Sequence, residues 1–288
     1  MKGVILAGGR GSRLLPLTSG ISKQLLPVYN KPLIYYPIST LMLADIRDIL
    51  VITTPQDEAQ FKRILGDGSN YGVSFNYAQQ LTPNGIAESI LIAEQFIGND
   101  SVSLILGDNV FYGQGLGNHL RRFRFPLGAH ILACKVSNPS QYGVVEINDK
   151  NEVISIEEKP QTPKSSFAVT GLYFYDNSVI DLAKQVQPSE RGELEISTLN
   201  NIFLQKKSLS VTVLERGTTW LDTGTFDDLH SASCLIKAIE DRQGSKVACL
   251  EEIAWRKGWI DDQRLLELAS VLGASPYGKY VKGLLGLI

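Results

Sequence analysis

The stretch that decides the fold is VILAGGRGSRLLPLTSGISKQLLP, residues 4–27. It begins with a short apolar run, which is typical of a buried strand, and then breaks into the glycine-rich segment AGGRG. Glycines let backbone N–H groups approach an anion closely, and the cations Arg13 and Lys23 follow the turn. The stretch therefore predicts a phosphate-binding loop that opens an α/β domain.

Two common phosphate-binding loops do not fit this turn. A dinucleotide fingerprint needs a third glycine, but Leu14 stands at that position. A Walker loop ends in Gly-Lys-Ser/Thr, whereas Ser12 and Arg13 follow Gly11. The remaining reading is that Arg13 grips a polyphosphate bidentately and Lys23 adds a point charge. Spacing alone leaves open the alternative that both are ordinary surface cations.

Apolar strands and amphipathic helices alternate over the first 110 or so residues. The patterns predict strands at 2–7, 48–54, 73–78 and 102–108, and helices at 32–47, 57–68 and 85–98. This order is typical of a Rossmann-like three-layer α/β sandwich, with a mixed, mostly parallel central sheet and helices on both faces.

The second half of the chain is richer in strands, which we expect to extend the same sheet. Strands are predicted at 129–136, 143–148, 153–160, 167–176 and 209–215, and helices at 176–186, 193–206 and 225–242. We expect one large domain over 1–242, with a first part at about 1–110 and a second part at about 111–225. Residues 243–288 read as a small C-terminal helical subdomain.

Composition narrows the class of protein. The chain has 288 residues, 43% of them hydrophobic, and a formal net charge of -2. This balance gives no bulk attraction to nucleic acid or to an anionic membrane. Cys134, Cys234 and Cys249 lack the spacing of a disulfide framework or zinc site. No leader or membrane-length apolar run is evident, so we expect a cytoplasmic protein.

Two aspartates are candidate metal ligands. Asp108 directly follows a predicted buried strand, at the sheet edge where α/β proteins bind ligands. Asp222 lies in WLDTGT, just ahead of a long predicted helix. Two carboxylates with phosphate oxygens commonly hold Mg²⁺, although a turn aspartate and a helix-cap aspartate are equally ordinary readings of each alone.

Several motifs occur in one order along nearly the whole chain: GVILAGGRGSRLLPLT, LGDGSNYGV, LGDNVFYG, YGVVE, EEKP, VTGLYFYD, RGELEI and WLDTGT. The set resembles the sugar-nucleotidyltransferase family, specifically its glucose-1-phosphate thymidylyltransferase branch. The resemblance implies an enzyme that makes dTDP-glucose and pyrophosphate from dTTP and α-D-glucose 1-phosphate, the first step toward dTDP-rhamnose and other deoxysugars. It also implies Mg²⁺ as cofactor and a homotetramer, a dimer of dimers. UTP-dependent uridylyl transfer and a non-catalytic sugar-nucleotide sensor are the alternatives.

The resemblance makes 1–242 the nucleotidyltransferase domain, with a nucleotide-binding part at about 1–110 and a sugar-phosphate-binding part at about 111–225. It also assigns roles to individual residues. The implied catalytic residues are Arg13, Lys23, Asp108, Lys159 and Asp222, with Asp108 and Asp222 binding the metal. The implied nucleotide-binding residues are Leu6, Gly8, Gly9, Gly11, Ser12, Arg13, Gln24, Gln80, Pro83, Gly85 and Asp108. The implied sugar-phosphate-binding residues are Asn109, Tyr142, Gly143, Glu158, Lys159, Val169, Gly171, Arg191 and Trp220. A second, regulatory site for a dTDP-sugar is implied at Tyr112, Gly113, His119, Glu252, Ile253 and Arg256.

The chain departs from the family pattern in two places. Asn84 stands where the family usually has aspartate, and Glu88-Ser89 stands where glutamine-alanine is common. These positions flank Gln80 and Gly85, which the resemblance assigns to the thymine, so the departures bear on base selectivity. The other departure is the run of arginines and phenylalanines in 118–130, which we expect to be a solvated surface or a subunit contact and not a nucleic-acid patch.

Overall fold

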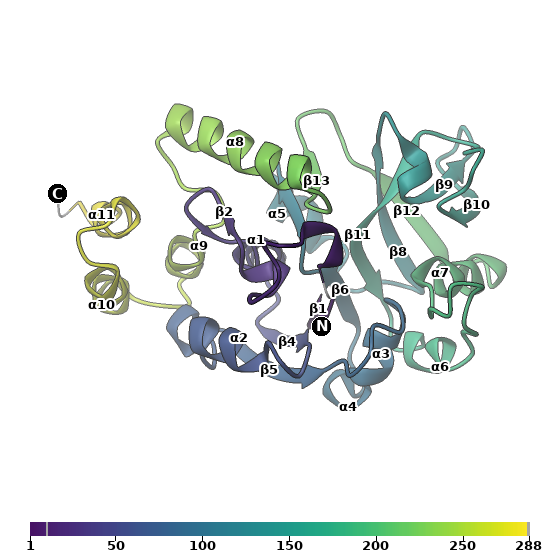
Figure 1. The fold of residues 1–288 in the computed structure, drawn as a ribbon, viewed down its shortest axis with the longest axis horizontal. Helices are drawn as coiled ribbons and strands as arrows, with labels where there is room; N and C mark the ends of the chain where they lie inside the picture. The colour runs from purple at the N-terminus through teal and green to yellow at the C-terminus, as the bar shows by residue number, and fades with distance from the viewer. Residues whose placement is uncertain (10, 287–288) are drawn as a thin grey trace.

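The computed structural model describes residues 1–9 and 11–286, and a nine-stranded sheet lies at its centre (Figure 1). The strands are β1 Lys2–Ala7, β4 Asp48–Thr53, β5 Ser74–Gln79, β6 Val102–Leu106, β8 Ala129–Lys135, β9 Gly143–Ile147, β10 Val153–Glu158, β11 Phe167–Tyr175 and β12 Leu209–Val213. Their order is β10-β9-β11-β6-β1-β4-β5, with β8 beside β11 and β12 beside β8. β1 is parallel to β4 and β6, whereas β11 is antiparallel to β6 and β8. The predicted mixed α/β sheet is confirmed.

Helices cover both faces of this sheet, which makes three layers. Adjacent residues of β1 show it, because Val4 and Ile5 are both fully buried but belong to separate hydrophobic clusters on opposite faces. On the Ile5 face lie α1 Tyr35–Leu43, α2 Glu58–Leu65 and α5 Leu116–Arg121. On the Val4 face lie α3 Glu88–Ile92, α4 Glu94–Ile97, α6 Val179–Ala183 and α7 Ile196–Gln205. Burial on both sides explains why β1 is almost continuously apolar.

The glycine turn follows β1 and is fixed by a hydrogen bond and by a buried leucine. Gly11 has φ +61°, a left-handed conformation that favours glycine, and its carbonyl accepts a 2.8 Å hydrogen bond from Thr18 Oγ1. A short 3₁₀ helix, Ser12–Leu14, comes next. Leu14 is fully buried against apolar residues of α8, Phe226–Gln243, so the turn is anchored to that long helix.

Some elements differ from the sequence-based expectation. Helix α1 is shorter than the predicted 32–47, because β2 Pro27–Val28 and β3 Lys31–Pro32 form a small hairpin before it. The single helix expected over 85–98 is two short helices, α3 and α4. The antiparallel pair β7 Asn109–Tyr112 and β13 Thr219–Asp222 was not predicted, since its two strands are far apart in the sequence and each is short.

The C-terminal helices gather at one end of the molecule (Figure 1). They are α9 Leu250–Arg256, α10 Asp262–Leu272 and α11 Pro276–Gly283. Helix α9 packs against α1, and Leu250, Leu265 and Val281 are fully buried in the same hydrophobic cluster as Ile5. The C-terminal helices therefore share the core of the sheet.

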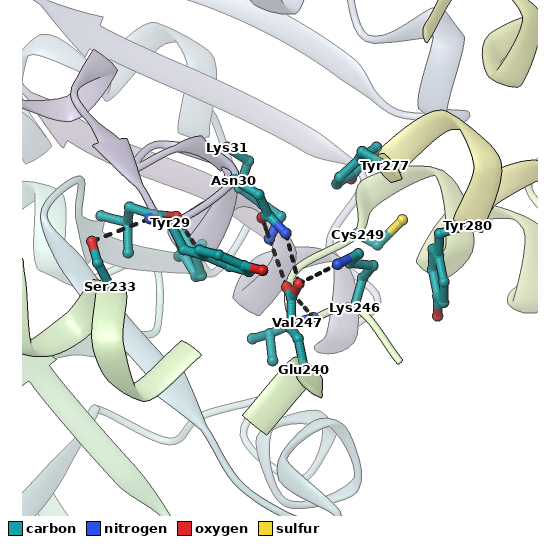
Figure 2. Close-up of polar contacts among 12 residues, drawn as sticks. Tyr29, Asn30, Lys31, Ser233, Glu240, Lys246, Val247, Cys249, Tyr277 and Tyr280 are labelled. Atoms are coloured by element: carbon teal, nitrogen blue, oxygen red, sulfur yellow. Dashed lines mark hydrogen bonds and ion pairs between the residues drawn. The ribbon is translucent and has the colours of Figure 1, made fainter. Parts of the chain in front are cut away.

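A buried carboxylate ties α8 to the β2–β3 hairpin and to the start of the C-terminal segment (Figure 2). Glu240, 4% exposed, accepts hydrogen bonds from Asn30 Nδ2 at 2.6 Å, Lys31 Nζ at 3.0 Å, Lys246 Nζ at 2.6 Å and the Val247 N–H at 3.1 Å. Burial opposes ionisation of Glu240, but the two lysines outweigh it and lower the pKa of this carboxyl. Burial likewise lowers the pKa of Lys31, the more enclosed of the two lysines.

The arginine stretch packs back onto the domain. Arg121 and Arg124 lie 3.6 Å and 3.9 Å from the Asp45 carboxylate, and Phe123 stacks on His130 at 3.9 Å between ring centroids. Phe125 remains exposed. Among the helices of residues 1–9 and 11–286, none is both long and apolar enough to cross a membrane.

Candidate active site

A cavity of about 290 Å³ opens where β1 and β6 end, beside the glycine turn. Most of the predicted catalytic and sugar-phosphate residues line it, together with three further predicted nucleotide-binding residues. They are Leu6, Gly9, Arg13, Gln24, Asp108, Asn109, Tyr142, Gly143, Glu158, Lys159, Val169, Gly171, Trp220 and Asp222. Residues this far apart in sequence meet here because parallel strands place their carboxyl ends at one edge of the sheet.

An ion pair joins the glycine-turn segment to the end of β6. Lys23 Nζ lies 2.5 Å from Asp108 Oδ2, and Lys23 is only 6% exposed because it begins a 3₁₀ helix, Lys23–Leu25, that packs under the turn. Burial alone would raise the pKa of Asp108, but the charge and hydrogen bond of Lys23 dominate and lower it. Asp108 is therefore held as a carboxylate.

The second aspartate reaches the same cavity from β13. Strand β13 pairs with β7 so that Asp222 lies opposite Asn109, and the next residue, Thr223, donates a 2.9 Å hydrogen bond to the Asp108 carbonyl. Burial and the nearby charge of Asp108 raise the pKa of Asp222 to about 6. The positive charges of Lys23 and Arg13 lower the pKa of Asp222, but they do not offset the effects of burial and of the Asp108 carboxylate.

The donor chemistry of this pair fits Mg²⁺. Both candidate ligands are carboxylates, and burial together with the charge of Asp108 raises the pKa of Asp222. Mg²⁺ prefers a few carboxylate oxygens together with phosphate and water. No cluster of three or more acidic, histidine or cysteine side chains suited to a metal occurs in the described part of the chain. The remaining ligands would come from substrate phosphate and water.

Arg13 lies against the aspartate loop. A Cβ built on Gly224 would sit 3.3 Å from both Arg13 guanidinium NH groups and 3.3 Å from Asp222 Oδ1. A glycine at this position therefore leaves room for the guanidinium beside the carboxylate. This places a bidentate anion donor next to the candidate metal ligands.

Asn109 braces the opposite wall of the cavity. Its Oδ1 accepts hydrogen bonds from Trp220 Nε1 at 2.5 Å and the Gly171 N–H at 3.1 Å, and its Nδ2 donates to Asp108 Oδ1 at 2.9 Å. The Tyr142 ring meets Trp220 edge-on at 5.2 Å. The side chain of Asn109 already makes three hydrogen bonds within the protein. The predicted contact of Asn109 with the sugar remains a prediction, and a sugar hydroxyl would have to share Asn109 with these partners.

The two cations predicted to bind the sugar phosphate lie differently. Lys159 lines the cavity from a left-handed backbone conformation, φ +43°, fixed by a 3.0 Å hydrogen bond from its N–H to the Tyr142 carbonyl. Arg191 does not line the cavity and instead pairs with Glu193 at 3.1 Å and Glu195 at 3.4 Å. A role for Arg191 therefore requires its side chain to turn inward.

Glu158 is the predicted sugar-binding carboxylate. Burial, reinforced by the charge of Glu195, raises its pKa. A Cβ on Gly143 would sit 3.3 Å from Glu158 Oε2, so that glycine leaves the carboxylate open to the cavity.

A second cavity, of about 430 Å³, continues from the first across Gly9. Of the predicted nucleotide-binding residues, Gly8, Gly9, Gln80 and Pro83 line it. Gly11, Ser12 and Gly85 line neither of these two cavities. Gly11 and Ser12 form the turn after β1, and Gly85 lies against Leu194.

Sequence reasoning missed several lining residues. They are Ile86, Leu106, Gln141, Ile156, Tyr173, Ile196, Ser197 and Asn200. The sequence did contain a signal for the last three. Ile196 ends the RGELEI motif, and Ser197 and Asn200 follow it within the first turns of α7, close to Ile196 on the helix surface. Tyr173 lies within the apolar strand β11, so the sequence pattern indicates a core residue and not a cavity-lining one.

A third cavity, of about 410 Å³, lies on another face, between β7, α5 and α9. Of the predicted regulatory residues, Tyr112, Gly113, Glu252, Ile253 and Arg256 line it. His119 instead lines a separate cavity of about 30 Å³.

The mixed sheet, the glycine turn and the carboxylate pair fit a nucleotidyl transferase, and the match to that family's profile shows that the chain belongs to it. The family's sequence profile, described as nucleotidyl transferase, matches residues 2–238.

Individual relatives narrow the branch. The glucose-1-phosphate thymidylyltransferase of Neisseria meningitidis serogroup A / serotype 4A is 57% identical over 286 residues, and that of Mycolicibacterium smegmatis is 59% identical over 285 residues. Each alignment covers 99% of both chains. The predicted resemblance is confirmed over the full length.

Solved structures agree in fold. A crystal structure of a candidate glucose-1-phosphate thymidylyltransferase from Bacillus anthracis, in complex with sucrose, is 42% identical with a TM-score of 0.76, covering 82% of this chain and 94% of that one. A UDP-glucose pyrophosphorylase complexed with UDP-glucose has a TM-score of 0.71 at 23% identity, covering 84% of this chain and 99% of that one, and so shares the fold.

Proposed function

We propose that the protein transfers the thymidylyl group of dTTP to α-D-glucose 1-phosphate and releases pyrophosphate, giving dTDP-glucose. One observation carries the proposal: a single cavity is lined by Arg13 of the glycine-turn segment, by the Asp108–Asp222 pair and by Lys159 with Glu158. The first two groups suit a triphosphate, and the last suits a sugar phosphate. The names of relatives at 57% and 59% identity support the same reaction.

The chain supplies positioning and charge, not a nucleophile. The phosphate of the sugar is already an anion that can attack the α-phosphorus in line, so no side chain needs to form a covalent intermediate. Lys159 would aim this phosphate, and Arg13 would bind the pyrophosphate as negative charge builds on it. Lys23 keeps Asp108 ionised. Asp108 and Asp222 would hold Mg²⁺, which would neutralise negative charge on the bound phosphates.

Uridylyl transfer has less support than thymidylyl transfer. The UDP-glucose pyrophosphorylase is 23% identical, against 57% and 59% for the thymidylyltransferases. A non-catalytic sensor is a weaker candidate than an enzyme, because the cations and both aspartates expected for turnover are present.

The test offers each nucleoside triphosphate singly with Mg²⁺ and glucose 1-phosphate and measures pyrophosphate. We expect fastest release with dTTP. Faster release with UTP would overturn the base assignment, and binding of dTDP-glucose without any release would support the sensor.

We further propose that the third cavity binds a dTDP-sugar as a feedback inhibitor, in a cytoplasmic homotetramer built as a dimer of dimers. Arg256 lines this cavity, its side chain is exposed beside Glu252, and a guanidinium suits a diphosphate. Sedimentation would give the oligomeric state. Inhibition by dTDP-rhamnose that Arg256→Ala abolishes, with basal turnover retained, is the expected result; competition with dTTP alone would contradict a separate site.

A further inference from the structure

Glu88 connects two amide side chains at the edge of the candidate nucleotide site. It is the first residue of α3 and is half-buried. One of its carboxylate oxygens accepts from Gln80 Nε2 at 2.7 Å, and the other accepts from Asn84 Nδ2 at 2.8 Å. Glu88 itself lines neither of the two adjoining cavities.

These contacts determine which way the Gln80 amide points. The same Nε2 also donates to the Gly85 carbonyl at 3.2 Å. A carboxylate and a carbonyl can only accept, so the atom between them must be the amide nitrogen, and both of its hydrogens are used. The carbonyl oxygen of Gln80 is the only hydrogen-bonding atom left.

That oxygen faces the glycine turn. A Cβ built on Gly8 would lie 2.6 Å from Gln80 Oε1, and both residues line the 430 Å³ cavity. Gln80 is 4% exposed, and no side chain within residues 1–9 and 11–286 donates a hydrogen bond to this oxygen. The cavity therefore presents a fixed acceptor.

We propose that Glu88 is a positioning residue that makes the base site select a ring N–H donor. The inference rests on the proposed function. Thymine and uracil carry a hydrogen on N3 that can donate to Gln80 Oε1. Cytosine carries a lone pair at N3, which would face the oxygen lone pairs of Gln80. Gln80 does not turn over to relieve this while Glu88, at 2.7 Å, and the Gly85 carbonyl, at 3.2 Å, both accept from its nitrogen.

The loop around Gln80 does not depend on the Glu88 side chain. The Leu194 N–H donates to the Asn84 carbonyl at 2.6 Å, and the Ala87 N–H donates to the Leu194 carbonyl at 3.0 Å. Gly85 has φ +108°, and a Cβ there would lie 2.4 Å from the Leu194 oxygen. Because the backbone is fixed in this way, a change of the Glu88 side chain should alter the direction of hydrogen bonds and leave the loop in place.

The experiment measures binding of dTTP and dCTP to the full chain by calorimetry with Mg²⁺ and compares their dissociation constants. The unaltered protein should favour dTTP. Glu88→Gln can either donate or accept, so of the two groups that hold Gln80 Nε2 only the Gly85 carbonyl, at 3.2 Å, still requires a donor. Gln80 therefore turns over more easily, and the preference for dTTP should fall by about tenfold.

A double variant provides the rescue. In Asn84→Asp with Glu88→Gln, the aspartate can only accept, so the new glutamine donates to it and turns its own oxygen toward Gln80 Nε2. The direction of the chain of hydrogen bonds is restored, and the preference for dTTP should return. Glu94→Gln, which alters an exposed glutamate paired with Lys184, is the matched control and should change nothing.

Three outcomes would overturn the inference. An unchanged preference in Glu88→Gln, or an equal loss of affinity for both nucleotides, would show that Glu88 does not orient Gln80. Failure of the double variant to restore the preference would show the same. If the unaltered protein does not bind dTTP, the proposed function fails as well; if it binds dTTP and only the variants disagree, the proposed function stands.

Discussion

Two cations in the cavity, Arg13 and Lys159, are expected to affect different kinetic constants. Arg13 lies beside Asp222, where charge on a leaving pyrophosphate would build, and Lys159 lines the cavity from its own hydrogen-bonded bend. Charge that develops only during reaction affects turnover, whereas charge present on the bound sugar phosphate affects affinity. The two cations should therefore give different kinetic signatures.

Arg13→Ala should lower kcat by about 10²–10³-fold, with KM for glucose 1-phosphate changed little. Lys159→Ala should mainly raise that KM. Steady-state kinetics checks both, with Arg63→Ala on the exposed face of α2 as the control that should leave both constants unchanged. The reverse pattern would mean that the two phosphate positions are exchanged.

Asp222→Asn removes one of the two candidate magnesium ligands. The concentration of Mg²⁺ that gives half-maximal activity should rise by at least about tenfold. Manganese binding followed by electron paramagnetic resonance gives a readout independent of turnover. Unchanged metal affinity in this variant would remove Asp222 from the metal site.

Residues of the candidate site could be predicted from the sequence where they belong to a recognisable motif. Contacts between the side chains of such residues could not be predicted, because they depend on the fold. Asn84 and Glu88 read as separate departures from the family pattern, yet their side chains contact each other at 2.8 Å. Their amide and carboxylate are exchanged relative to the family's aspartate and glutamine, and an acceptor for Gln80 remains. Only the three-dimensional contact reveals this compensation.

Secondary-structure elements were predictable where periodicity was strong. The continuous apolar run of β1 and the 3.6-residue pattern of α8 need no tertiary information. By contrast, β7 and β13 pair only with each other, and α5 contains glycine, so local pattern gave no signal for them. The missed pair β7–β13 is the one that brings Asp222 to Asp108.

The Glu240 junction between α8 and the β2–β3 hairpin should carry measurable stability. Glu240→Gln leaves two lysines with an uncharged partner in a buried place, so the free energy of unfolding at pH 7 should fall by roughly 3 kcal/mol. Asp241→Asn is the control on the same helix, because its pair with Lys237 is exposed and should contribute less than about 0.5 kcal/mol.

The sign of the pH dependence follows from the lowered pKa of Glu240. Its contribution is fully present above the unfolded pKa of roughly 4.3 and is lost as pH falls through the folded value. Urea unfolding at pH 7 and in acid should therefore show the gap between the unaltered protein and Glu240→Gln closing in acid. A gap that widens in acid would contradict a stabilising carboxylate.

At the scale of the whole molecule, one core serves both the sheet and the C-terminal helices. Leu250, Leu265 and Val281 lie in the same buried cluster as Ile5 of β1. Composition and strand–helix alternation were enough to predict the α/β class, but not this sharing of a core, because amphipathic helices do not reveal what they pack against.

Removal of residues 250–288 should therefore destabilise the entire chain and not merely trim it. We expect the full protein to unfold in one calorimetric transition and the truncated chain to lose that transition or to aggregate. A truncated chain that unfolds cooperatively at an unchanged temperature would show that the C-terminal helices form an independent unit.

The central claim is that the sugar phosphate attacks the α-phosphorus of dTTP directly. The measurement is to supply dTTP labelled with ³²P at the α-phosphate together with Mg²⁺ and glucose 1-phosphate, and to follow the label and pyrophosphate. The account predicts that the label appears in dTDP-glucose in equal amount to the pyrophosphate released. Label that appears in dTMP, becomes attached to the protein or remains in dTTP would contradict it.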